Sequence, residues 1–387
     1  MIPIKYNLRN LAVRWVTTLM TVLGTGLVVW ASVLTFGLTD GLEHALRISG
    51  EPLDVIVLRK GSNDETGSGI EQQTASEMVS LPGIAKSAAG EPLCSIEYAT
   101  ILTKPRRGDG GTTNLIVRGL DPIGRQLRPG FQITQGRDLK PGVNEIITSE
   151  SMARRFQNLA LGEKLEINKV DFTVVGFFEA GGSAAESEVW CDRRDLTSAR
   201  RLPGAVTSVN LRARDEESLQ QLVERIQGDE QFKLSAWREV DYFESQMSAS
   251  IAVKYIGRVI AGFLTFGAMF AAANTMYSAV ANRAREIGTL RALGFPRSSI
   301  LCSFLMESVM LCLLGGLLGC LATLPFNGLS TGTANWATFS ELTFSFRFGP
   351  AVLLRGVLLA LAMGLLGGLF PAIRAIRLRT VDALRQA

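Results

Sequence analysis

The sequence predicts an α-helical membrane protein with four transmembrane helices and one large extracytoplasmic α+β domain. Four stretches of the 387 residues carry almost no charge, and each is long enough to cross about 30 Å of hydrocarbon as a helix. A polar segment, residues 40–254, separates the first stretch from the second. Basic residues gather at both chain ends and in one short loop, which defines a single side of the membrane.

The predicted transmembrane spans are residues 15–39, 255–281, 298–325 and 350–373. Basic residues precede the first span, as they would precede a signal peptide. This span has 25 residues without a charge, which is longer than a usual signal-peptide core, and no small-x-small cleavage site follows it. We therefore expect the first span to be retained as a membrane helix.

The orientation follows from the distribution of basic residues. The N-tail 1–14, the loop 282–297 and the C-tail 374–387 together hold 11 basic and two acidic residues, and all three fall on one predicted side. The positive-inside rule makes that side cytoplasmic. Segment 40–254 on the other side holds 26 basic and 32 acidic residues. Neither balance favours nucleic acid as a partner.

The extracytoplasmic segment 40–254 is predicted to contain two strand–helix–strand units that pair into one α+β layer. Alternating β-forming residues and turn signals separate their elements. In chain order we expect a strand, a helix and a strand at 53–58, 71–81 and 93–103, with a return strand at 114–118, and then a strand, a helix and a strand at 206–212, 215–227 and 232–236.

An insertion at about 119–203 lies between these two units. It is rich in turns and short strands, expected at 145–149, 164–168, 172–178 and 188–191. This composition predicts a mostly β subdomain mounted on the first. Helical patterns at 42–49 and 237–254 predict two stalks that continue the first and second spans outward, and the short extracytoplasmic loop 326–349 has room for a hairpin.

The loop 282–297 is predicted to contain a short amphipathic helix. Ala284, Ile287 and Leu290 are spaced three residues apart, and Arg283 with Glu286 forms an opposite-charge pair at i, i+3. Gly294, followed by Phe295 and a proline, predicts the end of the helix. Such a helix fits two interpretations, a surface offered to a partner protein and an interfacial helix resting on lipid headgroups.

Several catalytic and metal-binding motifs are absent from the sequence. It contains no phosphate-binding P-loop, no H-E-x-x-H, no C-x-x-C and no G-x-S-x-G. His44 is the single histidine, without Cys or carboxylate neighbours at ligand spacing, so we expect no metal site and no catalytic site. The chain is not expected to be an enzyme or to hydrolyse ATP unaided.

Glu307 is a charge inside the third predicted span. Such a residue can mark an ion path or can be paired within the protein, for example with Arg297. Because a single residue forms no proton relay, we favour pairing.

The glycines of the last two spans fit two interpretations. They form small-x-x-x-small faces that permit close helix packing, and they could equally permit bending. The four positions are Gly315, Gly319, Gly364 and Gly368. The sequence also leaves open a disulfide between Cys94 and Cys191, because spacing alone does not fix their separation in space.

Several motifs together resemble the MacB/FtsX superfamily of ABC transporter permeases. In the membrane part these are A-N-T-M at 273–276, R-E-I-G-T-L-R-A-L-G at 285–294, M-E-S-V at 306–309 with G-G-x-x-G at 315–319, and G-L-F-P-A-I-R-A-I-R-L-R-T-V-D-A-L-R at 368–385. In the polar segment they are G-R-D-L at 136–139, E-I-I-T-S-E-S-M-A-R-R-F at 145–156 and V-V-G-F-F at 174–178, which are similar to that family's periplasmic core domain. The resemblance covers nearly the whole chain.

The resemblance implies a four-helix permease with a two-lobed outer domain, called porter and sabre, in the bacterial inner membrane with both termini cytoplasmic. It also implies that the loop helix is a coupling helix docked on an ABC ATPase. The implied coupling residues are Arg283, Arg285, Glu286, Ile287, Gly288, Leu290, Arg291, Leu293 and Gly294. We expect Ile287, Leu290 and Leu293 to supply apolar contact, with Gly288 permitting close approach. Since only a short tail precedes the first span, we expect the ATPase, with its ATP and Mg²⁺, to be a separate chain.

Two functions follow from the resemblance. The first is a permease that works as a dimer of identical or different chains and exports or extracts lipoprotein, lipid, peptide or hydrophobic compounds, with a periplasmic adaptor and an outer-membrane channel as further partners. The alternative is an FtsX-like regulator whose motion activates an extracytoplasmic hydrolase without moving cargo. The sequence does not choose among the cargoes.

Overall fold

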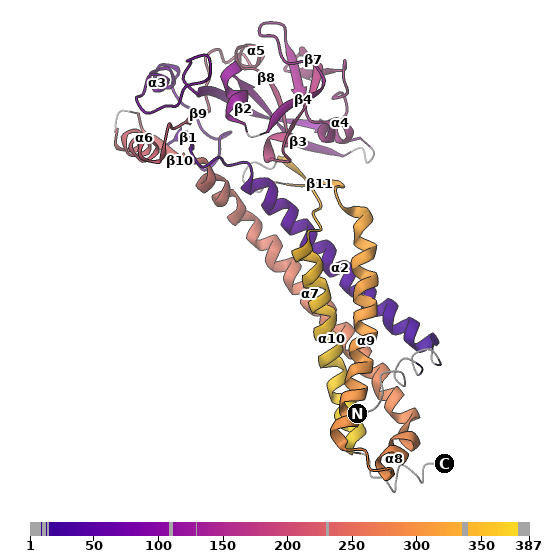
Figure 1. Cartoon of the computed structure of the whole chain (residues 1–387). Helices are drawn as coiled ribbons and strands as arrows, with labels where there is room; N and C mark the ends of the chain where they lie inside the picture. The colour runs from indigo at the N-terminus through magenta and orange to yellow at the C-terminus, as the bar shows by residue number, and fades with distance from the viewer. Residues whose placement is uncertain are drawn as a thin grey trace. The chain divides into compact units, whose positions relative to one another are not determined.

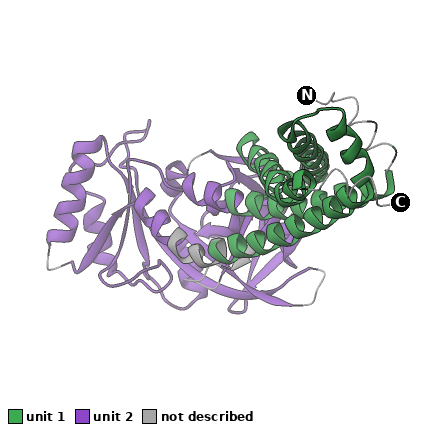
Figure 2. Cartoon of the chain, turned by 90° about the horizontal axis from the view of Figure 1, so that it is seen from below, with its two compact units in different colours: residues 1–40, 252–329, 346–387 green, residues 41–251, 330–345 purple. Residues whose placement is uncertain are grey.

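The computed structural model describes residues 9, 13, 15–107, 111–128, 130–229, 232–334 and 340–377, and of residues 247–254, 330, 333 and 334 it describes only the backbone. The chain divides into two compact units, coloured in Figure 2. The membrane unit comprises residues 1–40, 252–329 and 346–387, and the extracytoplasmic unit comprises residues 41–251 and 330–345. The predicted tails 1–14 and 374–387 lie mostly outside the described residues.

The membrane unit contains four helices that are long and apolar enough to cross a membrane, as the sequence predicts. They are α2 (Trp15–Arg47), α7 (Glu239–Asn282), α9 (Arg297–Thr323) and α10 (Pro350–Arg377) (Figure 1). Helices α2 and α7 extend beyond the apolar spans, which confirms the helical stalks expected at 42–49 and 237–254. A short helix, α8 (Ala284–Ala292), connects α7 to α9, and the turn η3 (Leu324–Phe326) follows α9.

Glycines bring these helices together at short distances. A Cβ atom on Gly315 would lie 2.7 Å from the Val22 carbonyl oxygen of α2, and one on Gly319 would lie 2.5 Å from the Gly26 carbonyl oxygen. On α10, a Cβ atom on Gly364 would lie 2.7 Å from Val309 Cα of α9. Gly368 has the same relationship to α9, where its Cβ would lie 2.5 Å from the Ser308 Cβ. At these four positions the close approach of another helix leaves no room for a Cβ atom, which favours the packing interpretation over bending.

The extracytoplasmic unit is built on a ten-stranded sheet. Its strand order is β10-β1-β9-β2-β3-β8-β5-β7-β4, and β6 pairs with β7 outside this path. The strands are β1 (Asp54–Arg59), β2 (Cys94–Pro105), β3 (Thr112–Leu120), β4 (Phe131–Gly136), β5 (Glu145–Thr148), β6 (Lys164–Ile167), β7 (Val170–Ala180), β8 (Glu188–Asp192), β9 (Ser208–Arg212) and β10 (Leu234–Arg238). The helices are α3 (Gln72–Met78), α4 (Glu150–Arg155), α5 (Arg193–Ala199) and α6 (Glu216–Gly228), with the 3-10 turns η1 (Pro122–Leu127) and η2 (Ala184–Ser187).

The two predicted strand–helix–strand units interleave in this sheet. Strand β9 of the second unit lies between β1 and β2 of the first, and β1 lies between β9 and β10. This is the order of a ferredoxin-like β-α-β-β-α-β fold. Met78 of α3 and Leu222 of α6 join the same buried cluster as Val55 and Val57 of β1, so both helices cover one face of the sheet. We call residues 53–96 and 206–238 the ferredoxin-like half.

The inserted segment forms the other half of the same sheet. Strand β8 of the insertion pairs in parallel with β3, the return strand of the first predicted unit, from Ile116↔Glu188 to Leu120↔Asp192, so the sheet continues from that unit into the insertion without a break. This corrects the expectation of a subdomain merely mounted on the first. The inserted half (residues 97–205) still has its own core, centred on Met152, Phe156 and Phe172. Helices α4 and α5 and strand β4 were not expected from the sequence.

The segment between α9 and α10 forms the predicted hairpin. Its strands β11 (Ser330–Ala334) and β12 (Glu341–Ser345) pair antiparallel, from Ser330↔Ser345 to Ala334↔Glu341. Both strands belong to the extracytoplasmic unit, although the helices on either side belong to the membrane unit.

Candidate functional site

Helix α8 begins and ends where the sequence predicts. After its last turn, the Gly294 N–H donates to the Arg291 carbonyl at 3.1 Å and the Phe295 N–H donates to the Leu290 carbonyl at 3.1 Å. These two bonds are a Schellman motif. In this motif the first residue after the helix cap has a positive φ. Gly294 supplies it with φ +90°. The chain then enters α9 directly after Pro296.

One face of α8 is buried against the transmembrane helices of its own chain. Ala284, Ile287 and Gly288 are buried, and Ile287 is only 1% exposed. Ile287 joins a cluster that includes Met276 and Val280 of α7, Ile300 and Phe304 of α9, and Ala372 and Ala375 of α10. This corrects the expectation for Ile287 and Gly288, because their side of the helix is occupied within the chain and is not open to a partner.

Arg283 fixes the start of α8. Its Nη1 donates to Glu307 Oε2 of α9 at 2.9 Å, and its Nε donates to Glu286 Oε2 at 3.0 Å. The Arg283 and Glu307 side chains are 9% and 5% exposed. The guanidinium also lies over the Phe304 ring, 5.1 Å from its centroid. We call Arg283, Glu286, Phe304 and Glu307 the α8 anchor.

The anchor contains the predicted Arg283–Glu286 pair, and it places Glu307 in an ion pair, which favours the pairing interpretation of this residue. The partner of Glu307 in this structure is Arg283, where the sequence had suggested Arg297. Phe304 was missed. The sequence could have indicated Phe304 by its position three residues before Glu307, because residues at this spacing lie on one face of a helix.

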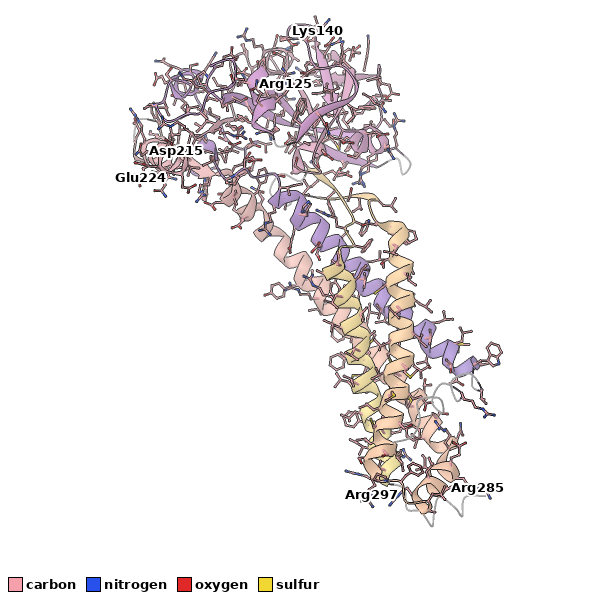
Figure 3. The ribbon with its side chains drawn as sticks, in the orientation of Figure 1. Arg125, Lys140, Asp215, Glu224, Arg285 and Arg297 are labelled. Atoms are coloured by element: carbon pink, nitrogen blue, oxygen red, sulfur yellow. The ribbon has the colours of Figure 1, made fainter. Side chains whose placement is uncertain are left out.

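The opposite face of α8 is exposed. Arg285, Thr289, Ala292 and Leu293 are exposed, Leu290 and Arg291 are half-buried, and Leu293 has the largest apolar exposure at 72%. Figure 3 shows Arg285 and Arg297 at the same end of the membrane unit. We call Arg285, Thr289, Leu290, Ala292 and Leu293 the α8 outer face. It combines positive charge with an apolar side chain, as the surface of a docking helix does.

A second concentration of charge lies inside the extracytoplasmic unit. Arg118 of β3 bonds three carboxylates, those of Glu65, Glu97 and Glu188, at 2.6 to 2.8 Å. Burial alone would raise the pKa of Glu65, but the Arg118 guanidinium outweighs it and lowers that pKa to about 2. The network lies on the sheet face opposite α3 and α6. Successive side chains of a strand point to opposite faces, and Ile96 belongs to the cluster under those helices, so Glu97 and its neighbour Arg118 point to the other face.

The first residue of α7 adjoins this network. Glu239 accepts a hydrogen bond from the Glu51 N–H at 3.0 Å, and its nearest cation is Arg128 at 3.7 Å. Burial raises the pKa of Glu239 to about 8, and the Arg128 charge only partly offsets the burial. Among the described residues, no group of histidine, cysteine and carboxylate side chains is arranged to hold a metal ion.

The two extracytoplasmic cysteines are free thiols. Cys94 belongs to the core of the ferredoxin-like half and Cys191 to the core of the inserted half. Burial raises the pKa of Cys94 to about 12 and that of Cys191 far above its usual range. The structure therefore decides against the disulfide that the sequence left open.

Comparison with known proteins gives two matching family models. Residues 18–229 match the MacB-like periplasmic core domain, which is more than half of the chain, and residues 258–379 match the FtsX-like permease C-terminal domain. The second model includes α8, the whole anchor and the glycines of α9 and α10.

Curated relatives align along most of the chain. The macrolide export ATP-binding/permease protein MacB of Bdellovibrio bacteriovorus is 27% identical over 94% of this chain and 58% of its own length. The MacB protein of Rhodopirellula baltica is 24% identical over 98% of this chain and 61% of its own length. The chain thus spans about 60% of the length of these relatives.

Among solved structures, the periplasmic region of MacB from Actinobacillus actinomycetemcomitans aligns with 54% of this chain and 97% of its own, at 13% identity and a TM-score of 0.37. The assignment rests on the two family models, of which the first covers nearly all of α2 and most of the extracytoplasmic unit and the second covers most of the membrane part of α7 together with α8, α9 and α10. The chain belongs to the MacB/FtsX superfamily of ABC transporter permeases.

Proposed function

We propose that this chain receives ATP-driven motion from a separate ATPase subunit at α8 and passes it to its extracytoplasmic domain. The observation that carries the proposal is the two-sided character of α8. Its inner face is fixed to α7, α9 and α10 by Ile287 and the α8 anchor, while its outer face exposes Leu293 and Arg285. A helix held in this way cannot be displaced without moving the transmembrane helices on which it is seated.

The topology supports the cytoplasmic position that coupling requires. Helix α7 leaves the extracytoplasmic unit and crosses the membrane once before α8 begins, so α8 lies on the opposite side. By the positive-inside rule, the excess of basic residues in the tails and in this loop predicts that this side is cytoplasmic, with both termini there. In this proposal the ATPase binds ATP and Mg²⁺, and this chain contributes no catalytic group.

The packing of the four helices argues for a cargo that does not pass between them within one copy. Gly315 and Gly319 bring α9 against α2, Gly364 and Gly368 bring α10 against α9, and apolar side chains fill the space between these helices. The cargo would then engage the extracytoplasmic domain. Lipoproteins, lipids, peptides and hydrophobic compounds that are already outside or in the outer leaflet fit this mechanism.

The proposal includes a second permease copy. The membrane segment of α7 is only 17% buried within the chain, and it exposes Tyr255, Phe263 and Phe270. Lipid or another copy must cover this surface in the membrane.

The test begins by purifying the tagged full chain from its native membranes and identifying the ABC ATPase that copurifies with it. ATP hydrolysis by the complex in nanodiscs is compared for wild type, Leu293→Asp and Leu161→Asp. Both leucines are exposed, at 72% and 49%, but Leu161 lies in the extracytoplasmic unit. We expect L293D to lower the stimulation of hydrolysis at least tenfold, because a charge enters an apolar contact, and L161D to leave it unchanged.

Full stimulation in L293D, or the absence of any copurifying ATPase, would contradict the proposal. Ile287→Asp is unsuitable as a probe, because Ile287 is buried and its loss would disturb folding. The same purification separates the two modes of action. A copurifying adaptor and outer-membrane channel support transport, whereas a copurifying cell-wall hydrolase supports the regulatory alternative.

A further inference from the structure

We propose that the β11–β12 hairpin is a second transmission arm, through which α9 and α10 act directly on the inserted half, and that Glu341 is the residue that fastens it there. The inference rests on the proposed function for its source of motion. The fastening itself is a property of the extracytoplasmic unit, because β11, β12 and the described residues that bond them there belong to that unit.

Glu341 is a buried carboxylate held by two arginines of the inserted half. It accepts hydrogen bonds from Arg106 Nε at 3.0 Å and Nη2 at 2.7 Å, and its other oxygen is paired with Arg155. Its side chain is only 1% exposed. A carboxylate buried to this extent is costly to strip of its cations. Withdrawal of the hairpin would separate Glu341 from both arginines and is opposed by this cost. We call Glu341, Arg106 and Arg155 the hairpin anchor.

Two residues along β12, a second attachment joins the same strand to the inserted half. The Thr343 N–H donates to Ser187 Oγ at 2.7 Å, and the Ser187 hydroxyl donates to the Thr343 carbonyl at 3.1 Å. The Thr343 hydroxyl also contacts Met152 Sδ at 3.6 Å. Met152 lies in the core of the inserted half, so β12 is attached to a closely packed and therefore rigid part of the domain.

Gly332 shows how closely β11 fits against the anchor. A Cβ atom at this position would lie 2.5 Å from Glu341 Oε1 and 2.6 Å from Arg155 Nη2. Any side chain there would displace the ion pair. Glycine usually weakens a β-strand. At position 332 its lack of a side chain leaves space for the Glu341–Arg155 pair.

The connections from the hairpin to the membrane helices have little slack. Residues 327–329 join η3 to β11, and residues 346–349 join β12 to α10. These connections bond each other, since the Gly328 N–H donates to the Phe346 carbonyl at 3.0 Å and the Phe346 N–H donates to the Leu329 carbonyl at 3.1 Å. Displacements of α9 and α10 are therefore passed on to the hairpin.

The other arm attaches to the other half of the sheet. Tyr242 near the start of α7 packs against Ile56 and Leu58 of β1, in the ferredoxin-like half. Motion of α9 and α10 relative to α7 would thus flex the sheet between its halves. A cavity of about 90 Å³, lined by Tyr242, by Leu342 of the hairpin and by Arg118 and Glu188 of the sheet, leaves space for such a shift.

The first experiment tests the fastening in the full chain in nanodiscs, without ATPase. Glu341→Gln keeps the size of the side chain but removes the charge, and Glu150→Gln is its control. Glu150 lies in the same half and forms an exposed pair with Arg154. We expect E341Q to accelerate hydrogen exchange of the 341–345 amides at least tenfold and E150Q to leave it unchanged. Unchanged exchange in E341Q overturns the proposal. If E341Q does not fold, Arg155→Gln replaces it, because it removes one arginine and leaves Arg106 in place.

The second experiment tests transmission in the complex with the copurified ATPase. Spin labels at Lys140→Cys and Glu224→Cys, exposed positions on the two halves (Figure 3), report the distance between the halves with and without MgATP and vanadate. The half-buried Cys302 is replaced by serine in this background. We expect the nucleotide-driven distance change to disappear in E341Q while ATP hydrolysis continues, and to persist in E150Q.

The outcomes separate the two ideas. If the distance change persists in E341Q although hydrogen exchange shows that the hairpin is loosened, the second arm is refuted and the proposed function stands. If the wild type shows no response to nucleotide, the proposed function fails, and transmission through the hairpin fails with it.

Discussion

Arg283 Nη1 donates to Glu307 Oε2 at 2.9 Å, and this bond joins the residue that caps the start of α8 to the third turn of α9. Both side chains are nearly fully buried, within a segment expected to lie at the cytoplasmic end of the membrane. The pair has two consequences. It favours a structural role for Glu307 over an ion path, and it attaches the start of α8 to α9.

The first prediction concerns this pair. Removal of either charge breaks the buried Arg283–Glu307 pair and leaves the exposed Glu286 as the ion-pair partner of Arg283 or leaves Glu307 without Arg283, which costs on the order of 3 kcal/mol of stability. Arg283→Met and Glu307→Leu should therefore each lower the unfolding temperature in nanodiscs, whereas the double variant should recover most of the loss. Single variants with wild-type stability would contradict the structural role of the pair, and loss of a proton current in E307L would favour an ion path instead.

The sequence predicted the membrane part closely because its signals are local. Long apolar runs give the four spans, and Gly294 before Phe295 and Pro296 gives the end of α8. What the sequence could not give is which face of α8 is buried. Ile287 and Leu290 have the same spacing pattern, and only the position of Phe304 and Ala375 on other helices decides that Ile287 is the buried one.

The extracytoplasmic domain shows the same limit at the level of topology. Most strands were predicted within a few residues, since alternation and turn residues mark them. The interleaving of β1, β9 and β2 and the parallel pairing of β3 with β8 depend on residues that are far apart in the chain. The two partners of Glu341 could not be predicted from the sequence either, because Arg106 and Arg155 lie more than 180 residues before it in the chain.

The second prediction separates packing from bending at the membrane glycines. In Gly315→Ala, the new Cβ would lie 2.7 Å from the Val22 carbonyl oxygen, so α2 and α9 must move apart, at a cost of about 1–3 kcal/mol. Gly262→Ala on α7 is the control, because nothing lies within 4 Å of its position. Thermal unfolding in nanodiscs should show a lower transition for G315A and not for G262A. Equal effects in both variants would mean that helix flexibility, and not packing, selects glycine.

The third prediction concerns the extracytoplasmic thiols. Because Cys94 and Cys191 are buried in separate cores and burial raises the pKa of both thiols, they should react with maleimide only after unfolding. Mass spectrometry should find both labelled in denaturant without prior reduction, and a reducing agent should leave the unfolding temperature unchanged. A mass two units lower with both residues unlabelled would show a disulfide and contradict the structure.

The fourth prediction concerns Glu239, where α7 enters the extracytoplasmic domain. Burial raises the pKa of this carboxyl from 4.5 to about 8, so the folded state holds its proton more tightly than the unfolded state does. The groups that face it are Arg128, Asp54, Glu97 and the Glu51 N–H. The stability that comes from protonated Glu239 is fully present below pH 4.5 and is lost as the pH rises through 8.

Glu239→Gln mimics the protonated form at every pH and can still accept the bond from the Glu51 N–H. Wild type and E239Q should therefore unfold at similar temperatures near pH 4.5, and E239Q should be more stable by a few kcal/mol at pH 9. Glu224→Gln, an exposed position on α6, is the control and should follow the wild type throughout. Thermal unfolding of the full chain in nanodiscs between pH 4.5 and 9 measures the difference. If the curves of E239Q and wild type stay parallel, Glu239 is ionised in the folded protein and faces Arg128 as a carboxylate and not as a neutral acid.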